Sequence, residues 1–304
     1  MKVVASRRYP GPAFDELHDA EVLPLDELRD PRQDVEGLVV ANEPVPLDLL
    51  PRLRIVANFG VGYDRIDVAG CAARGVVVTN TPGVLDNATA DLAFALVLAT
   101  RRQIVESDRL VRGGGWVGPW SEGRLADEVT GSTLGIVGLG RIGSAVARRA
   151  HGFNLRVLYT QRRRIETELG DFRELETLLE EADIVTIHAP LTSETHGLLN
   201  ARRLALLRDG ACLVNTARGE IVDEEALVAE LVSGRIRAGL DVFAHEPRVP
   251  RELLDLPNVV LTPHLGSATR QTRAAMTRLV VDNLLAVERG EAPLTPVVAR
   301  AASR

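Results

Sequence analysis

Residues 133–143 read TLGIVGLGRIG, and this stretch decides the fold. Its first five residues have the apolar, β-branched composition of a buried strand, and its glycines lead directly into a helical pattern. In this order Gly138 allows a tight turn, Gly140 lets backbone amides approach a pyrophosphate, and Gly143 permits close packing of the helix on the strand. The stretch therefore predicts a dinucleotide-binding turn. The residues predicted to contact the dinucleotide are Gly138, Leu139, Gly140, Arg141, Ile142 and Gly143.

On both sides of this turn the chain alternates short β-branched runs with helical patterns. After TLGIV, the runs LRVLYT, DIVTIHAP, ACLVNTA, AGLDVF and NVVLTPH complete six strands of one doubly wound parallel sheet. Before it, the runs KVVAS, GLVV, RIVAN and VVVTN predict a second, smaller sheet. We therefore expect an α/β fold in which a Rossmann-type domain is inserted into a smaller, flavodoxin-like substrate domain.

Two long helical patterns are expected to link these domains. Residues 87–112 carry a helical pattern without Pro or Gly, and residues 267–289 carry another that is longer than one sheet needs. A chain of 304 residues also exceeds the usual size of a single core. We predict a discontinuous substrate domain of residues 1–99 and 284–304, and a dinucleotide-binding domain of residues 100–283.

Composition and charge argue against several other classes of protein. The formal net charge is -6, whereas nucleic-acid-binding proteins usually carry an excess of positive charge that pairs with phosphates. The longest apolar run, residues 92–99, is shorter than the roughly 20 residues of a membrane span, and the first residues lack the long apolar segment of a signal peptide. Cys71 and Cys212 have no partners at metal-ligand spacing and are interpreted as buried small hydrophobes. We expect a cytoplasmic protein without a metal, a membrane partner or a nucleic-acid partner.

The residues after the second strand of the cofactor domain bear on which dinucleotide binds. An NAD site usually places an acidic residue there, about 20 positions after the glycine turn, to bind the ribose hydroxyls. This chain instead has Gln161, Arg162, Arg163 and Arg164. Because arginine can pair with a 2′-phosphate, we predict that Gln161, Arg162 and Arg163 contact the cofactor, that NADP is preferred and that NAD can also bind. The alternative is a solvated arginine turn without a role.

Three predicted strand ends each carry a polar side chain that packing does not explain. They are Arg218 in NTARG, Glu246 in DVFAHEP and His264 in TPHLG. Ligands of open α/β sheets bind beyond the carboxyl ends of the strands. Histidine can deliver a proton to a ketone oxygen, a neighbouring carboxylate would keep it protonated and oriented, and arginine can bind a carboxylate. Singly, each residue has a structural interpretation as a hydrogen-bonding histidine, a turn residue or a helix cap; together they predict a site for reducing a carbonyl.

Seven segments, in this order, resemble the D-isomer-specific 2-hydroxyacid dehydrogenase family, and most of all its glyoxylate and hydroxypyruvate reductases. They are NFGVGYDRIDV, NTPGVLDNATADLAFALVLATRR, GIVGLGRIG, HAPLTSETHGLLN, LVNTARGEIVDEEAL, AGLDVFAHEP and LTPHLGSAT. The resemblance implies reduction of a small 2-oxo acid, such as glyoxylate or hydroxypyruvate, to the D-2-hydroxy acid. It also implies a homodimer built through the cofactor domains.

The resemblance assigns roles to single residues. It implies that His264 is the proton donor, Glu246 its paired carboxylate and Arg218 the arginine that holds the substrate. The backbone amides of Val61 and Gly62 match the loop that grips the substrate carboxylate.

Further positions match cofactor contacts of the family. Asp241 matches the aspartate that hydrogen-bonds the nicotinamide carboxamide, and Pro190, Ala217 and Gly266 fall in segments that line the cofactor. Trp120 matches a tryptophan that reaches the partner's active site in the reductases, although a surface or interface packing role is an equal alternative.

Other functions stay open on sequence alone. A formate dehydrogenase of the same family would lack the glutamate at position 246, and short phosphoglycerate dehydrogenases usually keep an acidic residue where Gln161 stands. A nucleotide-sensing protein, like the corepressors of this fold, would keep the histidine, glutamate and arginine. Turnover of NADPH with glyoxylate separates an enzyme from such a binding protein.

Overall fold

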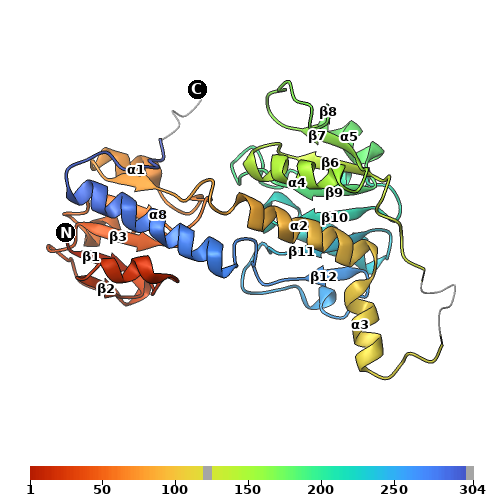
Figure 1. The fold of residues 1–304 in the computed structure, drawn as a ribbon, viewed down its shortest axis with the longest axis horizontal. Helices are drawn as coiled ribbons and strands as arrows, with labels where there is room; N and C mark the ends of the chain where they lie inside the picture. The colour runs from red at the N-terminus through yellow and green to blue at the C-terminus, as the bar shows by residue number, and fades with distance from the viewer. Residues whose placement is uncertain (119–124, 299–304) are drawn as a thin grey trace. The chain divides into compact units, whose positions relative to one another are not determined.

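The computed structural model describes residues 1–118 and 125–298 and divides the chain into two compact units. The first unit consists of Met1–Leu85 together with Ser267–Arg304, and the second consists of Asp86–Gly266. Each unit is built on one parallel β-sheet covered by helices (Figure 1). The predicted α/β class and the insertion of one domain into another are therefore seen in the structure.

The first unit contains a five-stranded sheet in the order β2-β1-β3-β4-β5. This is the flavodoxin-like order, in which the chain reverses direction across the sheet after its first crossover. All residues of β1, β3 and β4 are buried, as expected for parallel strands covered on both faces. β2, with the sequence AEV, was not expected because it is a partly exposed edge strand without an apolar run. The elements are β1 (Val3–Ala5), β2 (Ala20–Val22), β3 (Gly37–Val40), β4 (Ile55–Asn58), β5 (Val77–Thr79), α1 (Val68–Ala73) and α8 (Arg270–Glu288).

The second unit contains a seven-stranded parallel sheet in the order β12-β11-β10-β9-β6-β7-β8. The six predicted strands are present, and a seventh of two residues, β8, pairs with the edge of β7. The strands are β6 (Thr133–Val137), β7 (Arg156–Thr160), β8 (Asp171–Phe172), β9 (Ile184–Ile187), β10 (Cys212–Asn215), β11 (Arg237–Leu240) and β12 (Val259–Leu261). The helices are α2 (Asp86–Arg101), α3 (Ile104–Arg112), α4 (Arg141–His151), α5 (Leu175–Glu181), α6 (Ala201–Leu204) and α7 (Glu224–Val232).

The two long helices place the unit boundaries elsewhere than the sequence predicted. The helical pattern of residues 87–112 forms two helices, α2 and α3, because Gln103 between them adopts a left-handed conformation with φ of 50°. Along its length α2 packs on α4, β10 and β11, and α8 packs on β4 of the first unit. The chain therefore changes unit at 85/86 and 266/267, whereas the predicted boundaries at 99/100 and 283/284 fall inside α2 and α8. An amphipathic helix belongs to the sheet that its apolar face covers, and that sheet cannot be identified from the helix alone.

Both cysteines lie in hydrophobic cores, which confirms their interpretation as small hydrophobes. Cys71 packs in the first unit among Val56, Ile66 and Val78, and Cys212 packs in the second. Burial raises the pKa of the Cys212 thiol to about 12, so this thiol is not a nucleophile at neutral pH. Among the described residues, no helix combines the length and apolar character needed to cross a membrane.

Candidate active site

The glycine turn between β6 and α4 has the geometry of a phosphate-binding turn. Gly138 has φ of 97° and donates its N–H to the Thr160 carbonyl at the end of β7 (2.8 Å). A Cβ at position 143 would lie 2.1 Å from the Gly138 carbonyl oxygen, so only glycine permits this packing. A Cβ at Gly140 would meet no atom within 4 Å, and this residue caps α4 without a side-chain hydrogen bond. The open space before the first N–H groups of α4 therefore suits the pyrophosphate of a dinucleotide.

The three predicted catalytic residues follow neighbouring strands of the second unit. Arg218 comes after β10, Glu246 after β11 and His264 after β12, and these strands are adjacent and parallel. His264 Nδ1 lies 2.8 Å from Glu246 Oε2, and the Phe243 N–H donates to Glu246 Oε1 (3.1 Å). The charge of Arg218 acts on the Glu246 carboxyl as well. The structure thus brings the three side chains together at one edge of the sheet.

The surroundings of Glu246 favour its ionised form. Burial alone would raise the pKa of this carboxyl. The hydrogen bond and charge of His264, the Phe243 N–H and the charge of Arg218 together hold the pKa of Glu246 below its ordinary value. Because a carboxylate only accepts hydrogen bonds, Nδ1 of His264 must carry a proton, and Nε2 is left as the nitrogen that can exchange a proton with a ligand.

Asp241 holds the turn that carries His264. Its side chain is fully buried, and its carboxylate accepts hydrogen bonds from Thr262 Oγ1 (2.7 Å), the Leu265 N–H (2.7 Å) and the Gly266 N–H (2.9 Å). Its carbonyl accepts the His264 N–H (2.9 Å). His264 has φ of 55°, a conformation uncommon for a residue with a side chain, so the turn needs this support. Burial raises the pKa of Asp241, although these hydrogen bonds and His264 oppose the rise.

Asn215 fixes the loop that carries Arg218. Its amide Nδ2 donates to the Arg218 carbonyl (2.8 Å), and its Oδ1 accepts the Ala217 N–H (3.0 Å). Arg218 Nη1 donates to the Ala217 carbonyl (2.7 Å). Sequence reasoning missed Asn215. The signal was an amide side chain at the last position of an otherwise apolar, buried strand.

The other predicted cofactor residues also lie at the carboxyl ends of strands in the second unit. After β7, the Gln161 amide donates to the Arg163 carbonyl (2.7 Å), and Arg162 pairs with Glu194 (3.5 Å). After β9, the Pro190 carbonyl accepts the Thr195 hydroxyl (2.6 Å). Ala217 and Gly266 lie in the loops that carry Arg218 and His264. Their contacts with a cofactor stay predictions.

The predicted substrate loop belongs to the first unit and follows β4. Asn58 Nδ2 donates to the carbonyls of Gly60 (3.1 Å) and Gly62 (2.8 Å), and Asn80 Nδ2 donates to the Val61 carbonyl (2.9 Å). In a trans peptide the C=O of one residue and the N–H of the next point in opposite directions. Because the Gly60 and Val61 carbonyls point toward the two asparagine amides, the N–H groups of Val61 and Gly62 point away from those amides. Sequence reasoning placed a loop of the substrate pocket around Asn58 but gave no role to the Asn58 and Asn80 amides, each of which also stands at the end of a strand pattern.

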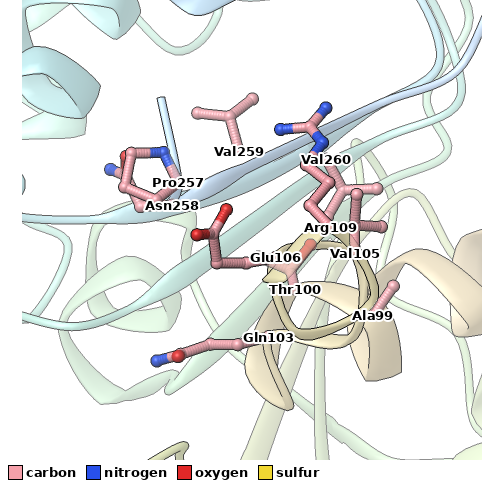
Figure 2. Close-up of a pocket in the computed structure, with 10 residues that line it drawn as sticks. All are labelled: Ala99, Thr100, Gln103, Val105, Glu106, Arg109, Pro257, Asn258, Val259 and Val260. Carbon is pink, nitrogen blue, oxygen red and sulfur yellow. The ribbon is translucent and has the colours of Figure 1, made fainter. Parts of the chain in front are cut away.

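Two hollows among the described residues lie apart from these side chains, and the larger, of about 420 Å³, is in the first unit and lined by residues such as Ser6, Arg7 and Glu43. Figure 2 shows the smaller hollow, lined by side chains of α3, such as Glu106 and Arg109, and by residues 257–260; its volume of about 10 Å³ holds about one water molecule. Within residues 1–118 and 125–298, no group of three or more His, Cys, Asp or Glu side chains could hold a metal ion. Trp120, predicted to reach a partner's active site, lies outside the described residues.

The chain is similar to proteins of one family along almost its whole length. Residues 94–266 match the family model described as "D-isomer specific 2-hydroxyacid dehydrogenase, NAD binding domain". A glyoxylate reductase from Pyrococcus furiosus is 50% identical over 288 residues, which cover 90% of this chain and 86% of the relative.

Solved structures are similar over both units. A protein of Thermus thermophilus superposes with a TM-score of 0.92 and 44% identity, covering 98% of this chain and 100% of that one. The NADPH-dependent glyoxylate/hydroxypyruvate reductase from Sinorhizobium meliloti, in complex with NADP and malonate, gives a TM-score of 0.89 and 39% identity over 99% of both chains.

Proposed function

This chain belongs to the D-isomer specific 2-hydroxyacid dehydrogenase family, and from that premise we propose that it is an NAD(P)-dependent oxidoreductase that reduces a small 2-oxo acid to the D-2-hydroxy acid. The observation that carries the proposal is the 2.8 Å contact between His264 Nδ1 and Glu246 Oε2, in the same unit as the glycine turn. The relatives named glyoxylate reductase and glyoxylate/hydroxypyruvate reductase support glyoxylate and hydroxypyruvate as substrates.

His264 serves as the proton donor in this proposal. When bound at the glycine turn, the nicotinamide cofactor supplies the hydride that reduces the substrate carbonyl. His264 delivers a proton from Nε2 to the substrate oxygen, while Glu246 holds Nδ1 and stabilises the positive charge on the imidazole. In the oxidation direction Nε2 accepts the proton from the substrate hydroxyl.

Arg218 of the second unit and, separately, the loop after β4 of the first unit are the proposed donors to a substrate carboxylate. The planar guanidinium of Arg218 can donate two parallel hydrogen bonds to a carboxylate, which places the adjoining carbonyl. The N–H groups of Val61 and Gly62 are further donors, and their direction is set by the Asn58 and Asn80 amides. Recognition of the carboxylate common to all 2-oxo acids explains how one site takes a class of small substrates.

NADPH is the preferred cofactor in this proposal, and NADH also binds. Arg162 and Arg163 are exposed after β7, and the residue before them is Gln161 instead of an acid. Arg162 pairs with Glu194, but the two side chains are 65% and 63% exposed, and ion pairs so exposed are weak. A 2′-phosphate, with its greater negative charge, can take the place of Glu194 as the partner of Arg162.

Two copies associate through their second units in this proposal. Ile104 and Val111 are seven residues apart on one face of α3 and are 52% and 55% exposed. Trp116, Val117 and Leu125 are also exposed after this helix. Apolar side chains left in water on one helix and the segment after it favour a protein interface. Light scattering should give the mass of a dimer for the wild type and a lower mass for Val111→Asp; a monomeric wild type contradicts the homodimer.

A substrate panel tests the proposed reaction. Glyoxylate, hydroxypyruvate, pyruvate, phosphohydroxypyruvate and larger 2-oxo acids are each offered with NADPH and with NADH, and the loss of reduced cofactor is followed by absorbance. We expect turnover of glyoxylate or hydroxypyruvate, with a D-configured product from hydroxypyruvate, since the product of glyoxylate is achiral. Formate oxidation, measured separately as the appearance of reduced cofactor from formate and the oxidised cofactor, or a preference for phosphohydroxypyruvate, would assign the chain to another branch of the family. Cofactor binding without turnover of any acid would favour a nucleotide-sensing protein instead.

A further inference from the structure

Glu224, the first residue of α7, contacts the turn that carries Glu246. Its Oε1 accepts a hydrogen bond from the Ala244 N–H (2.9 Å). Ala244 lies two residues before Glu246, in the segment between β11 and the catalytic carboxylate. The neighbouring residue Asp223 caps α7 through the Ala226 N–H, so the capping of this helix does not need Glu224.

The same turn rests directly on the loop of Arg218. A Cβ at Gly219 would lie 2.0 Å from the Phe243 carbonyl carbon and 2.2 Å from the Ala244 nitrogen. The backbone of residues 243–244 therefore packs against the residue that follows Arg218. Residues 218–224 thus touch the turn at two points, one through backbone packing and one through the Glu224 carboxylate.

Two consecutive N–H groups of the turn have different carboxylates as acceptors. The Phe243 N–H donates to Glu246 Oε1 (3.1 Å), and the Ala244 N–H donates to Glu224 Oε1 (2.9 Å). Fixing the Ala244 N–H fixes the plane of the peptide between residues 243 and 244. That plane limits how Phe243 can rotate, and Phe243 in turn holds the carboxylate that meets His264.

We propose that Glu224 is a positioning residue, which acts through Ala244 to hold Glu246 in register with His264 and with the Arg218 loop. This inference rests on the proposed function, because it needs Glu246 and His264 to be catalytic. Displacing a catalytic group by about an ångström can lower the rate about 100-fold, so a lost support of this kind should be measurable.

The test compares Glu224 with its neighbour Glu225. Both are acidic residues in the first turn of α7, but Glu225 is exposed. We expect Glu224→Ala to lower kcat about tenfold with KM for the 2-oxo acid changed less than about twofold, and Glu225→Ala to behave as the wild type. Glu224→Gln keeps an oxygen acceptor and should recover kcat to within about threefold of the wild type. If Glu224→Ala does not fold, Glu224→Asp replaces it, because the shorter side chain cannot reach Ala244.

A double variant separates positioning from a general loss of structure. In the Glu246→Gln background, Glu224→Ala should lower kcat by less than about twofold further, because the group that it positions has already been disabled. Equal activity of Glu224→Ala and Glu225→Ala overturns the inference, and so does an undiminished loss in the Glu246→Gln background. If Glu246→Gln alone has wild-type kcat, the inference is also overturned, because Glu246 would have no catalytic role for Glu224 to support. The proposed function fails only if the wild type reduces no 2-oxo acid, and the two failures are thus distinguishable.

Discussion

The glycine turn and the acid site occupy the same edge of one sheet, yet they are built in opposite ways. The turn is a continuous stretch, residues 138–143, whose fit depends on backbone N–H groups and on positions where a side chain is missing. The acid site joins Arg218, Glu246 and His264 from three separate segments, and it depends on contacts between side chains. Binding of the cofactor and chemistry on the substrate should therefore respond to different substitutions.

Removing the proton donor His264 should give the largest loss of activity and leave the glycine turn intact. We expect His264→Ala to lower kcat/KM for the 2-oxo acid about 10³-fold, because general acid catalysis contributes roughly 10²- to 10⁴-fold. The dissociation constant of NADPH, measured by fluorescence titration, should change less than about threefold, since the turn uses none of this side chain. Near-wild-type turnover would remove His264 from the mechanism, and a comparable loss of NADPH binding would mean that the two regions are not separable.

Changing the turn should give the converse result. Gly143→Ala places a Cβ 2.1 Å from the Gly138 carbonyl oxygen. We expect NADPH to bind about 30-fold more weakly, and stability to fall by about 1–3 kcal/mol, the usual cost of overpacking. Isothermal titration and urea unfolding measure the two effects.

Gly140→Ala is the matched control for this packing. Gly140 has φ of -78°, which alanine adopts, and its Cβ would meet no atom within 4 Å. This variant should keep wild-type stability to within about 0.5 kcal/mol, the usual range for unpacked positions, while it obstructs the pyrophosphate. Equal loss of stability in both variants would contradict the account of close helix-to-strand packing.

The same contrast explains which features the sequence could predict. The glycine turn, the buried strands and the polar residues at strand ends are local patterns, so they could be located without the structure. The contact of Glu224 and the carboxylate contacts of Asp241 could not, because each depends on which backbone groups, 20 or more residues away in the sequence, the fold brings within 3 Å or so. The domain boundaries failed for a related reason: the apolar faces of α2 and α8 do not say which sheet they cover.

A smaller effect is expected at the rim of the turn, where side chains add to backbone recognition. The double substitution of Arg162 and Arg163 by Gln should lower kcat/KM for NADPH about tenfold or more, the loss expected for a charge-assisted hydrogen bond. In the same double variant, kcat/KM for NADH should change less than about twofold. Arg164→Gln is the control. The Arg164 guanidinium lies over the Phe172 ring, 6.0 Å from its centroid, so Arg164 already has a contact within the protein and is not predicted to bind the cofactor. A wild type that prefers NADH, or equal losses with both cofactors, would contradict a role for these arginines at the 2′-phosphate.

The smallest effect should come from the pH dependence of the Glu246–His264 pair. The folded protein lowers the pKa of Glu246 below its ordinary value of 4.5, so the stabilisation from its carboxylate is present above that value and is lost as pH falls through the lowered pKa. The difference in unfolding free energy between the wild type and Glu246→Gln should therefore shrink between pH 7 and pH 3. This difference in unfolding free energy should stay under about 1 kcal/mol, because the Glu246 side chain is 36% exposed and solvent screens ion pairs that are so exposed.

Measuring this difference, instead of the wild type alone, removes the contribution of carboxylates elsewhere in the fold. Glu16, Glu21 and Glu176 also have pKa values lowered by arginine partners, but they titrate alike in both proteins. In the His264→Ala background the difference should be smaller still, because the main partner of the carboxylate is gone. A difference that is constant from pH 7 to pH 3 would mean that folding does not lower the pKa of Glu246, and the acid site would then lack the electrostatic feature that distinguishes it from the glycine turn.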